Sequence, residues 1–255
     1  MYSKNRLIAG TQLIELETVD STNAELARRV ARELVPEGTV IHTQRQSHGR
    51  GQAGNLWQSE ANNNLTFSLI IYPGNILIRE QFFLSMAVSV AIYRVVRRYV
   101  SNCFVKWPND IYIGHHKLGG ILIENALQGE KIKHSIIGIG LNINQKTFSR
   151  ELPNPTSLAL ATGKDTNTAD LLQELLNELD ACLLQLRAHN FKTLKDEYLA
   201  ALYRWKQPYL FEINGEPEEG IIQGVSDTGE LQVLINGEVR QFQFKQIKYL
   251  YEWWT

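Results

Sequence analysis

Apolar positions in the first hundred residues follow strand and helix periods in turn. Short strands are predicted at 12–16 and 38–45. Between them we expect a helix at about 23–34, with one apolar stripe formed by Leu26, Val30 and Leu34. Thr22 and Glu25 have the spacing of a capping box at its start. The segment 64–72 alternates and then becomes fully apolar, which predicts a buried strand. A long helix is predicted over about 79–100, with inward-facing Phe82, Met86, Val90 and Tyr93.

The next hundred residues predict a run of strands and then a run of helices. The strands are expected at about 103–107, 109–113, 118–125 and 132–143. Two helices follow, at about 168–188 and 190–203. The first is rich in leucine, and Thr168 is its predicted N-cap.

After Pro208 the pattern changes to short strands separated by turn residues. The turns are Asn214-Gly215, Thr228-Gly229 and Asn236-Gly237, and the last predicts a type I′ hairpin. This spacing indicates a small antiparallel barrel. We therefore expect two domains, residues 1–205 and residues 206–255.

Composition excludes several classes of protein. Hydrophobic residues make up 44% and charged residues 21% of the 255 positions, as in ordinary globular proteins. A formal net charge of −1 gives no overall field that would recruit nucleic acid or an anionic membrane. Cys103 and Cys182 have neither metal-ligand nor CxxC spacing, and no apolar run or leader-like N-terminus predicts membrane insertion or export. We expect a cytoplasmic protein.

The segment Gly49–Gly54 matches the G-x-G-x-x-G pattern of dinucleotide-binding loops. The pattern needs a helix after the loop and an acidic residue about twenty positions later, and neither is predicted here. A loop between strands can still hold phosphate through its N–H groups, and Arg50 adds a forked cation. The alternative is a plain surface loop. Trp57 favours a ligand that offers a base for stacking, although a core tryptophan is the commoner case.

A second candidate site lies in the predicted hairpin that runs from Lys106 to Glu124. Gly119-Gly120 removes side chains from a strand and permits close approach of a ligand beside Lys117. Asp110 is a candidate ligand of Mg²⁺. The alternative is an ordinary hairpin with a solvated lysine. Gly138 and Gly140 alternate along the next strand and predict a slot in which a flat ligand could lie.

Together these segments resemble the biotin protein ligase family. The resemblance covers nearly the whole chain and rests on motifs in the family's order: Asp20-Ser21-Thr22-Asn23, Gly49-Arg50-Gly51 with Trp57, Lys106-Trp107-Pro108-Asn109-Asp110, Lys117–Glu124 and Gly138–Asn142. It implies an α+β fold, in which a mixed β-sheet flanked by helices forms a catalytic domain similar to that of class II synthetases. A small SH3-like β-barrel would follow at the C-terminus.

The resemblance also implies roles for individual residues. The catalytic residues would be Arg50, Lys117 and Lys106. Biotin would be bound by Ser21, Thr22, Asn23, Gln46, Gly49, Arg50, Lys117, Gly120, Leu122 and Gly138. ATP would be bound by Arg50, Gly51, Gln52, Asn55, Trp57, Asn109, Asp110 and Asn142, with Asp110 also holding Mg²⁺.

The implied reaction joins biotin to ATP as biotinyl-5′-AMP and passes biotin to a lysine of a biotin carboxyl carrier protein. A membrane partner is not expected from the net charge of −1 and the lack of a long apolar run. A nucleic-acid partner is not expected either, because the family's catalytic motifs begin within the first twenty residues and leave no room for a helix-turn-helix domain. The chain would be a monomer or a homodimer. Many members carry arginine at the positions of Gln52 and Asn55. Lipoate or octanoate ligases and transferases, and a non-catalytic module that binds biotin or an adenylate, remain as alternatives.

Overall fold

The computed structural model of the chain describes residues 6–250, with the backbone alone at residue 53. The outer limits of the two predicted domains, residues 1–5 and 251–255, lie outside the described residues. The predicted boundary between the domains stays a prediction. No helix in the described part combines the length and the apolar character needed to cross a bilayer.

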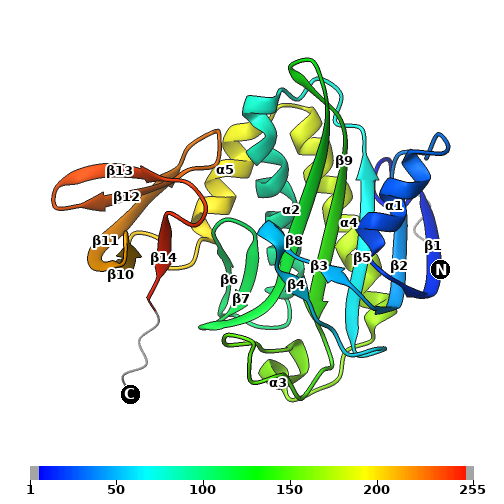
Figure 1. Cartoon of the computed structure of the whole chain (residues 1–255), viewed down its shortest axis with the longest axis horizontal. Coiled ribbons are helices and arrows are strands. Elements are labelled where there is room, and N and C mark those ends of the chain that lie inside the picture. The colour runs from blue at the N-terminus through cyan, green and yellow to red at the C-terminus, as the bar shows by residue number, and fades with distance from the viewer. Residues whose placement is uncertain (1–5, 251–255) are drawn as a thin grey trace.

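A seven-stranded sheet forms the centre of the molecule (Figure 1). Its strands lie in the order β1-β2-β5-β9-β8-β7-β6. Only β1 and β2 run parallel, and the other neighbours are antiparallel, so the predicted mixed sheet is confirmed. The strands are β1 (Gln12–Val19), β2 (Thr39–Gln46), β5 (Asn64–Ile71), β6 (Cys103–Lys106), β7 (Asp110–Ile113), β8 (His116–Gln128) and β9 (Lys131–Asn142).

Helices cover both faces of this sheet, which confirms the predicted α+β class. On one face, α1 (Thr22–Val30) packs its Leu26 against Ile41, Ile70 and Ile136. The other face is covered by α2 (Gln81–Val96, preceded by the turn η2, Ile78–Glu80), α4 (Thr168–Arg187) and α5 (Phe191–Ala200). A short helix that the sequence did not predict, α3 (Leu158–Thr162), lies after β9.

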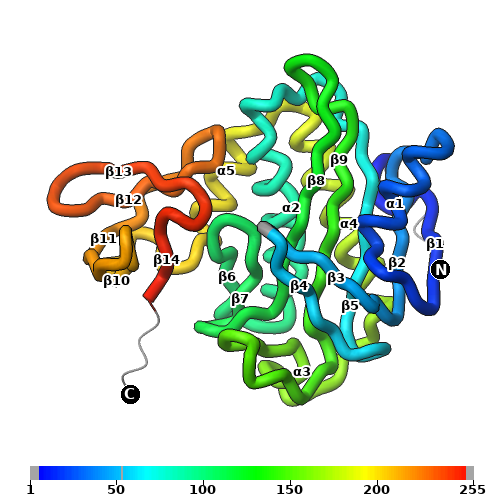
Figure 2. Tube along the Cα trace, in the orientation of Figure 1, coloured from blue at the N-terminus to red at the C-terminus, as the bar shows by residue number. Residues whose placement is uncertain are grey.

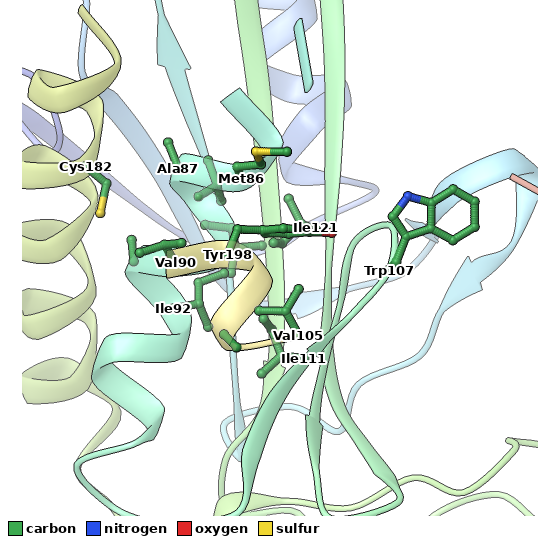
Figure 3. Packing of buried hydrophobic residues seen from close by; sticks show 14 of the residues in the cluster. Met86, Ala87, Val90, Ile92, Val105, Trp107, Ile111, Ile121, Cys182 and Tyr198 are labelled. Atoms are coloured by element: carbon green, nitrogen blue, oxygen red, sulfur yellow. The ribbon is translucent and has the colours of Figure 1, made fainter. Parts of the chain in front are cut away.

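The larger core lies between the sheet and α2, α4 and α5. Met86, Ala87, Val90 and Ile92 of α2 gather with Val105, Ile111 and Ile121 of the sheet and Tyr198 of α5 (Figure 3). These residues are almost completely buried, as expected for the main source of folding free energy. Trp107, at the turn between β6 and β7, points away from this group.

Helix ends differ from the sequence predictions. Ser21, not Thr22, caps α1, because its extended backbone lets Oγ accept from the N–H of Ala24, and Glu25 instead pairs with Arg28 and Arg29. Asn167, not Thr168, caps α4. The predicted stripe is wrong at Leu34, which is 89% exposed because α1 has already ended at Val30.

A separate antiparallel sheet follows Lys206, as predicted. Its strands are β10 (Pro208–Ile213), β11 (Glu216–Val225), β12 (Leu231–Ile235), β13 (Glu238–Phe242) and β14 (Ile247–Tyr249), in the order β13-β12-β11-β10-β14. Asn236 and Gly237 both have positive φ, at 51° and 86°, which confirms the predicted tight hairpin. We call residues 208–249 the C-terminal unit. Trp107 Nε1 joins it to the larger part by donating to the carbonyl of Gly229 over 2.8 Å.

Candidate functional site

The alternation of side chains along the strands decides where a ligand can lie. Residues on the α2 face of β9, such as Ile137 and Ile139, are apolar and buried in the larger core. Their neighbours Gly138 and Gly140 face the α1 side, beside Ser68 and Thr66 of β5 and Leu122 and Gly120 of β8. The sheet therefore offers a polar, glycine-rich floor on the side of α1, next to the N-terminus of that helix.

The glycine loop covers this glycine-rich face of the sheet. It consists of β3 (Gly49–Arg50), the turn η1 (Gln52–Gly54) and β4 (Leu56–Trp57), and it lies across the sheet in Figure 2. Between loop and floor is a cavity of about 160 Å³. The predicted site residues that line it are Ser21, Thr22, Asn23, Gln46, Arg50, Gly51, Gln52, Asn55, Trp57, Lys106, Asn109, Asp110, Lys117, Gly120, Leu122 and Gly138.

One end of the cavity is a small network of hydrogen bonds. The backbone N–H and the hydroxyl of Thr22 both donate to Gln46 Oε1, over 2.8 and 3.1 Å. Ser68 Oγ lies 2.6 Å from the Thr22 hydroxyl and 2.5 Å from Asn23 Oδ1. The turn before α1 is fixed from outside by Asp20, whose pKa is held below its usual range chiefly by the hydrogen bond from Arg28. This end can therefore present ordered donors and acceptors to a compact polar ring.

Arg50 crosses from the glycine loop to β8. Its Nη2 donates to both carboxylate oxygens of Glu124, over 3.0 and 2.9 Å. Glu124 also accepts a bond of 2.7 Å from Asn23 Nδ2. Glu124 thus ties the loop to the network at the start of α1.

Lys117 is held from three sides. Its ammonium pairs with Asp110 of β7 over 2.7 Å. Its backbone N–H donates to Asn154 over 2.7 Å, and its carbonyl accepts from Thr156 over 2.9 Å. The segment 154–156 therefore acts as a strap that fixes the lysine at a bulge where β7 pairs with β8.

Lys106 lies at the border with the C-terminal unit. Its ammonium is 5.2 Å from the ring centre of Tyr112 and 4.8 Å from that of Tyr249, at cation–π distance from both. It still lines the cavity. The position allows Lys106 to contribute charge to the cavity while it also joins the two parts of the chain.

The slot predicted along β9 is filled by side chains of the protein. A Cβ atom added at Gly138 would come within 2.3 Å of Asn23 Oδ1, and one added at Gly140 within 2.5 Å of the indole of Trp57. Trp57 is therefore seated on the sheet, and its Nε1 is buried without a hydrogen-bond partner among the described residues. A Cβ atom added at Gly120 of β8 would instead make ordinary van der Waals contacts, with Asp110 at 3.4 Å and Lys117 at 3.7 Å.

Two predicted site residues do not line the cavity. A Cβ at Gly49 would meet the carbonyl of Trp57 at 2.4 Å, so this glycine permits the pairing of β3 with β4. Asn142 Nδ2 donates to the carbonyl of Thr156 over 3.0 Å. Asn142 thus supports the strap that holds Lys117, and its contact with a nucleotide stays a prediction.

Sequence reasoning missed several residues around the cavity. Glu124 belongs to the motif Lys117–Glu124, but no role was predicted for it. It alternates with Gly120 and Leu122 along β8, so its side chain lies on the same face of the sheet as theirs. Phe244 of the C-terminal unit also lines the cavity, together with Trp107 and Leu56. No local signal could have found Phe244, because the contact joins distant parts of the chain.

The described residues contain no group of three or more His, Cys, Asp or Glu side chains that could hold a metal ion. Asp110 offers a single carboxylate. Mg²⁺ is often held by one or two carboxylates together with the phosphates of a substrate. The donor set therefore fits a magnesium ion that arrives with a nucleotide.

Comparison with known proteins places the chain among similar ligases. The model of the biotin/lipoate A/B protein ligase family matches residues 15–142. The bifunctional ligase/repressor BirA of Bacillus spizizenii is 31% identical over 192 residues, which cover 74% of this chain and 58% of that protein. The biotin–[acetyl-CoA-carboxylase] ligase of Paracoccus denitrificans is 28% identical, over 85% of this chain and 91% of its own length.

Solved structures agree with the sequence comparison. The biotin protein ligase from Aquifex aeolicus in complex with biotin and ATP matches with a TM-score of 0.76 and 25% identity, over 93% of this chain and 98% of that chain. The family model spans half of the chain and contains the glycine loop, Lys117 and the glycines of β9. This chain belongs to the biotin/lipoate A/B protein ligase family.

Proposed function

We propose that this chain activates biotin with ATP and transfers it to a lysine of a biotin carboxyl carrier protein. The observation that carries the proposal is that Arg50 of the glycine loop and Lys117 of β8 line one glycine-floored cavity, each beside a carboxylate of the protein. Simple capture of a neutral ring does not need two such cations. The names of the similar ligases from several organisms support biotin as the acid.

The first step would join two anions. A biotin carboxylate oxygen attacks the α-phosphorus of ATP, a P–O bond forms, and pyrophosphate leaves. Arg50 and Lys117 would neutralise the repulsion and stabilise the charge that develops in the transition state. Glu124 pairs with Arg50 and Asp110 pairs with Lys117 in the structure. The arginine keeps further N–H groups for a ligand, because only its Nη2 bonds to Glu124.

The polar network at the start of α1 would orient the biotin ring, with Ser21, Thr22 and Gln46 toward its ureido group. Leu122 and Gly120 would border the acyl chain that leads to Lys117. On the nucleotide side, Trp57, Gln52, Asn55 and Asn109 would contact ATP. Asp110 would hold the magnesium ion that accompanies the phosphates, and such an ion neutralises their charge when bound.

The second step would transfer the acyl group. The acceptor amine attacks the carbonyl carbon of biotinyl-5′-AMP, an amide bond forms, the bond to the phosphate oxygen breaks, and AMP and one proton leave. No nucleophile of the protein is required. The glycine loop would exclude water from the mixed anhydride, which otherwise hydrolyses.

The test uses the purified chain, MgATP, a carrier domain and either biotin or lipoate. We expect the carrier to gain the mass of biotin and pyrophosphate to be released. Mass gain with lipoate and none with biotin would favour the lipoate alternative. Binding of biotin without release of pyrophosphate would exclude catalysis and favour a binding module.

A further inference from the structure

A second cleft opens from the main cavity. It has a volume of about 190 Å³ and lies between the tip of the glycine loop, the N-terminus of α2, β8 and the C-terminal unit. Gln52, Asn109 and Leu122 line both spaces. Asn109 and Leu122 each lie within two residues of Asp110 or Gly120, the positions beside the Lys117 ammonium. The two spaces therefore meet where the reacting carboxylate is expected.

The chemistry of the cleft differs from that of the main cavity. Its polar lining consists of amides and hydroxyls, among them Gln81, Ser85, Asn125 and Thr228. Among the residues that the structure describes, none of the side chains lining this cleft is ionisable. Phosphate groups bind where cations or clustered N–H groups neutralise them. The cleft is therefore poorly suited to the nucleotide phosphates or to departing pyrophosphate.

An uncharged cleft suits an incoming amine. A lysine ammonium has a pKa near 10.4 in water, and it can attack only after losing its proton. A partly enclosed space without carboxylates disfavours the charged form and so favours the neutral amine. Amide and hydroxyl side chains also match the N–H and C=O groups of a peptide backbone. At the junction, Gln52 Oε1 is buried and accepts no hydrogen bond from the described residues, so it can accept one from an amine N–H.

We propose that this cleft admits the acceptor lysine and the peptide segment that carries it, with Gln52 Oε1 positioning the amine beside the acyl carbon. The amine nitrogen then forms a bond to that carbon, the acyl–phosphate oxygen bond breaks, and AMP leaves with release of one proton. This inference rests on the proposed function. It adds that the acceptor touches both parts of the chain, since Thr228 belongs to the C-terminal unit.

The test separates the two half-reactions. Gln81→Trp and Ser85→Gln place larger side chains in the cleft, at an exposed and a half-buried position of α2, and Gln128→Trp is the control at an exposed position of β8 that does not line it. Pyrophosphate release reports adenylation. Formation of the hydroxamate with hydroxylamine reports acyl transfer to a small amine, and labelling of a purified biotin carrier domain reports transfer to protein. Circular dichroism and melting temperature confirm folding.

Both cleft variants should keep adenylation and hydroxamate formation, while kcat/KM for the carrier domain falls about tenfold, equivalent to ~1.4 kcal/mol. The control variant should keep all three. Unchanged carrier transfer in both cleft variants, with normal adenylation, would overturn the inference alone. Loss of adenylation in these folded variants would assign the cleft to the nucleotide and also overturn it. A wild-type chain that releases no pyrophosphate would overturn the proposed function and the inference together.

Discussion

Arg50 and Lys117 carry the same charge to one cavity, but the chain supports them very differently. Lys117 belongs to a strand inside a seven-stranded sheet, and its backbone is bonded on both sides by the strap at 154–156. Arg50 belongs to a ribbon of two short strands whose ties to the sheet include the Glu124 pair and the seat of Trp57 on Gly140. Arg50 and Glu124 are 45% and 39% exposed, and such exposed pairs contribute about 0–1 kcal/mol.

This difference indicates that Lys117 is held firmly in the floor of the cavity, whereas Arg50 belongs to the glycine loop, which we expect to open and close as a lid. Segments held by few buried contacts open locally at low cost, whereas a central strand opens only with the whole domain. Because the glycine loop carries Arg50, an anionic ligand in the cavity should favour its closed position. We therefore expect substitutions at Lys117 to affect the chemical step and substitutions at Arg50 to affect both rate and retention of the intermediate.

The largest effect should follow Lys117→Ala. Loss of a fixed cation in the transition state is expected to lower the rate of adenylation by about 10²–10³-fold. Single-turnover release of pyrophosphate measures it. Lys133→Ala, at an exposed position of β9, is the control and should react normally. A near-normal rate in Lys117→Ala with an unchanged melting temperature would remove this lysine from the mechanism.

Arg50→Ala should have the next largest effect. A hydrogen bond to a charged group is worth about 1.5–3 kcal/mol, so adenylation should fall about 10- to 100-fold. Release of the preformed adenylate should also become faster, because the glycine loop loses the guanidinium that would bind the adenylate. Arg50→Lys should restore the charge without the fork. If Arg50→Ala lowered the melting temperature as much as a core substitution, Arg50 would be as firmly held as Lys117, and the proposed difference between them would be wrong.

Alanine substitutions at Gly119 and Gly140 compare how firmly the sheet and the glycine loop are held. A Cβ at Gly119 would meet the carbonyl of Gly140 at 2.4 Å, whereas one at Gly140 meets the indole of Trp57. Gly119→Ala should lower the free energy of unfolding by about 1–3 kcal/mol, because the sheet cannot yield. Gly140→Ala should cost less than about 1 kcal/mol and instead expose the glycine loop to protease. Denaturant melts measure the free energy of unfolding, and limited proteolysis measures exposure of the glycine loop. Equal destabilisation by the two substitutions would contradict the proposed mobility of this loop.

The smallest effect is expected for Gln52→Arg. The substitution adds a second cation to the loop, close to where the phosphate of the adenylate is expected. A new, partly exposed ion pair should slow release of the intermediate by about two- to fivefold. Gln58→Arg, at an exposed position after β4, adds the same charge as a control. Filtration with labelled biotin measures the release of the adenylate. Equal release rates in the two variants would show that the loop does not close over the phosphate.

Local patterns in the sequence were enough for much of the fold. The segment of β5, which alternates and then becomes fully apolar, and the alternating glycines of β9 predicted two central strands, because both faces of these strands are covered. Turn chemistry at Asn236-Gly237 predicted a hairpin. The pattern failed at Leu34, since the helical period continues in the sequence beyond the point where the chain turns away at Ala31.

The candidate site was predictable as a set of residues but less so as a set of contacts. Most of the predicted residues line one cavity. The partner of Arg50 was not found, because Glu124 lies 74 positions away and no local period relates the two. For the same reason the sequence could not show that Trp57 and Asn23 fill the slots above Gly140 and Gly138.

The bond from Trp107 to the carbonyl of Gly229 has a consequence for how this chain could be recombined with its relatives. Together with Phe244 at the cavity wall, it makes the C-terminal unit part of the site. A chimera that exchanged residues 208–249 as an independent module would also exchange one wall of the cavity and the ring of Tyr249 beside Lys106. Functional chimeras should therefore inherit the turn of β6 and β7 and the C-terminal unit from the same parent.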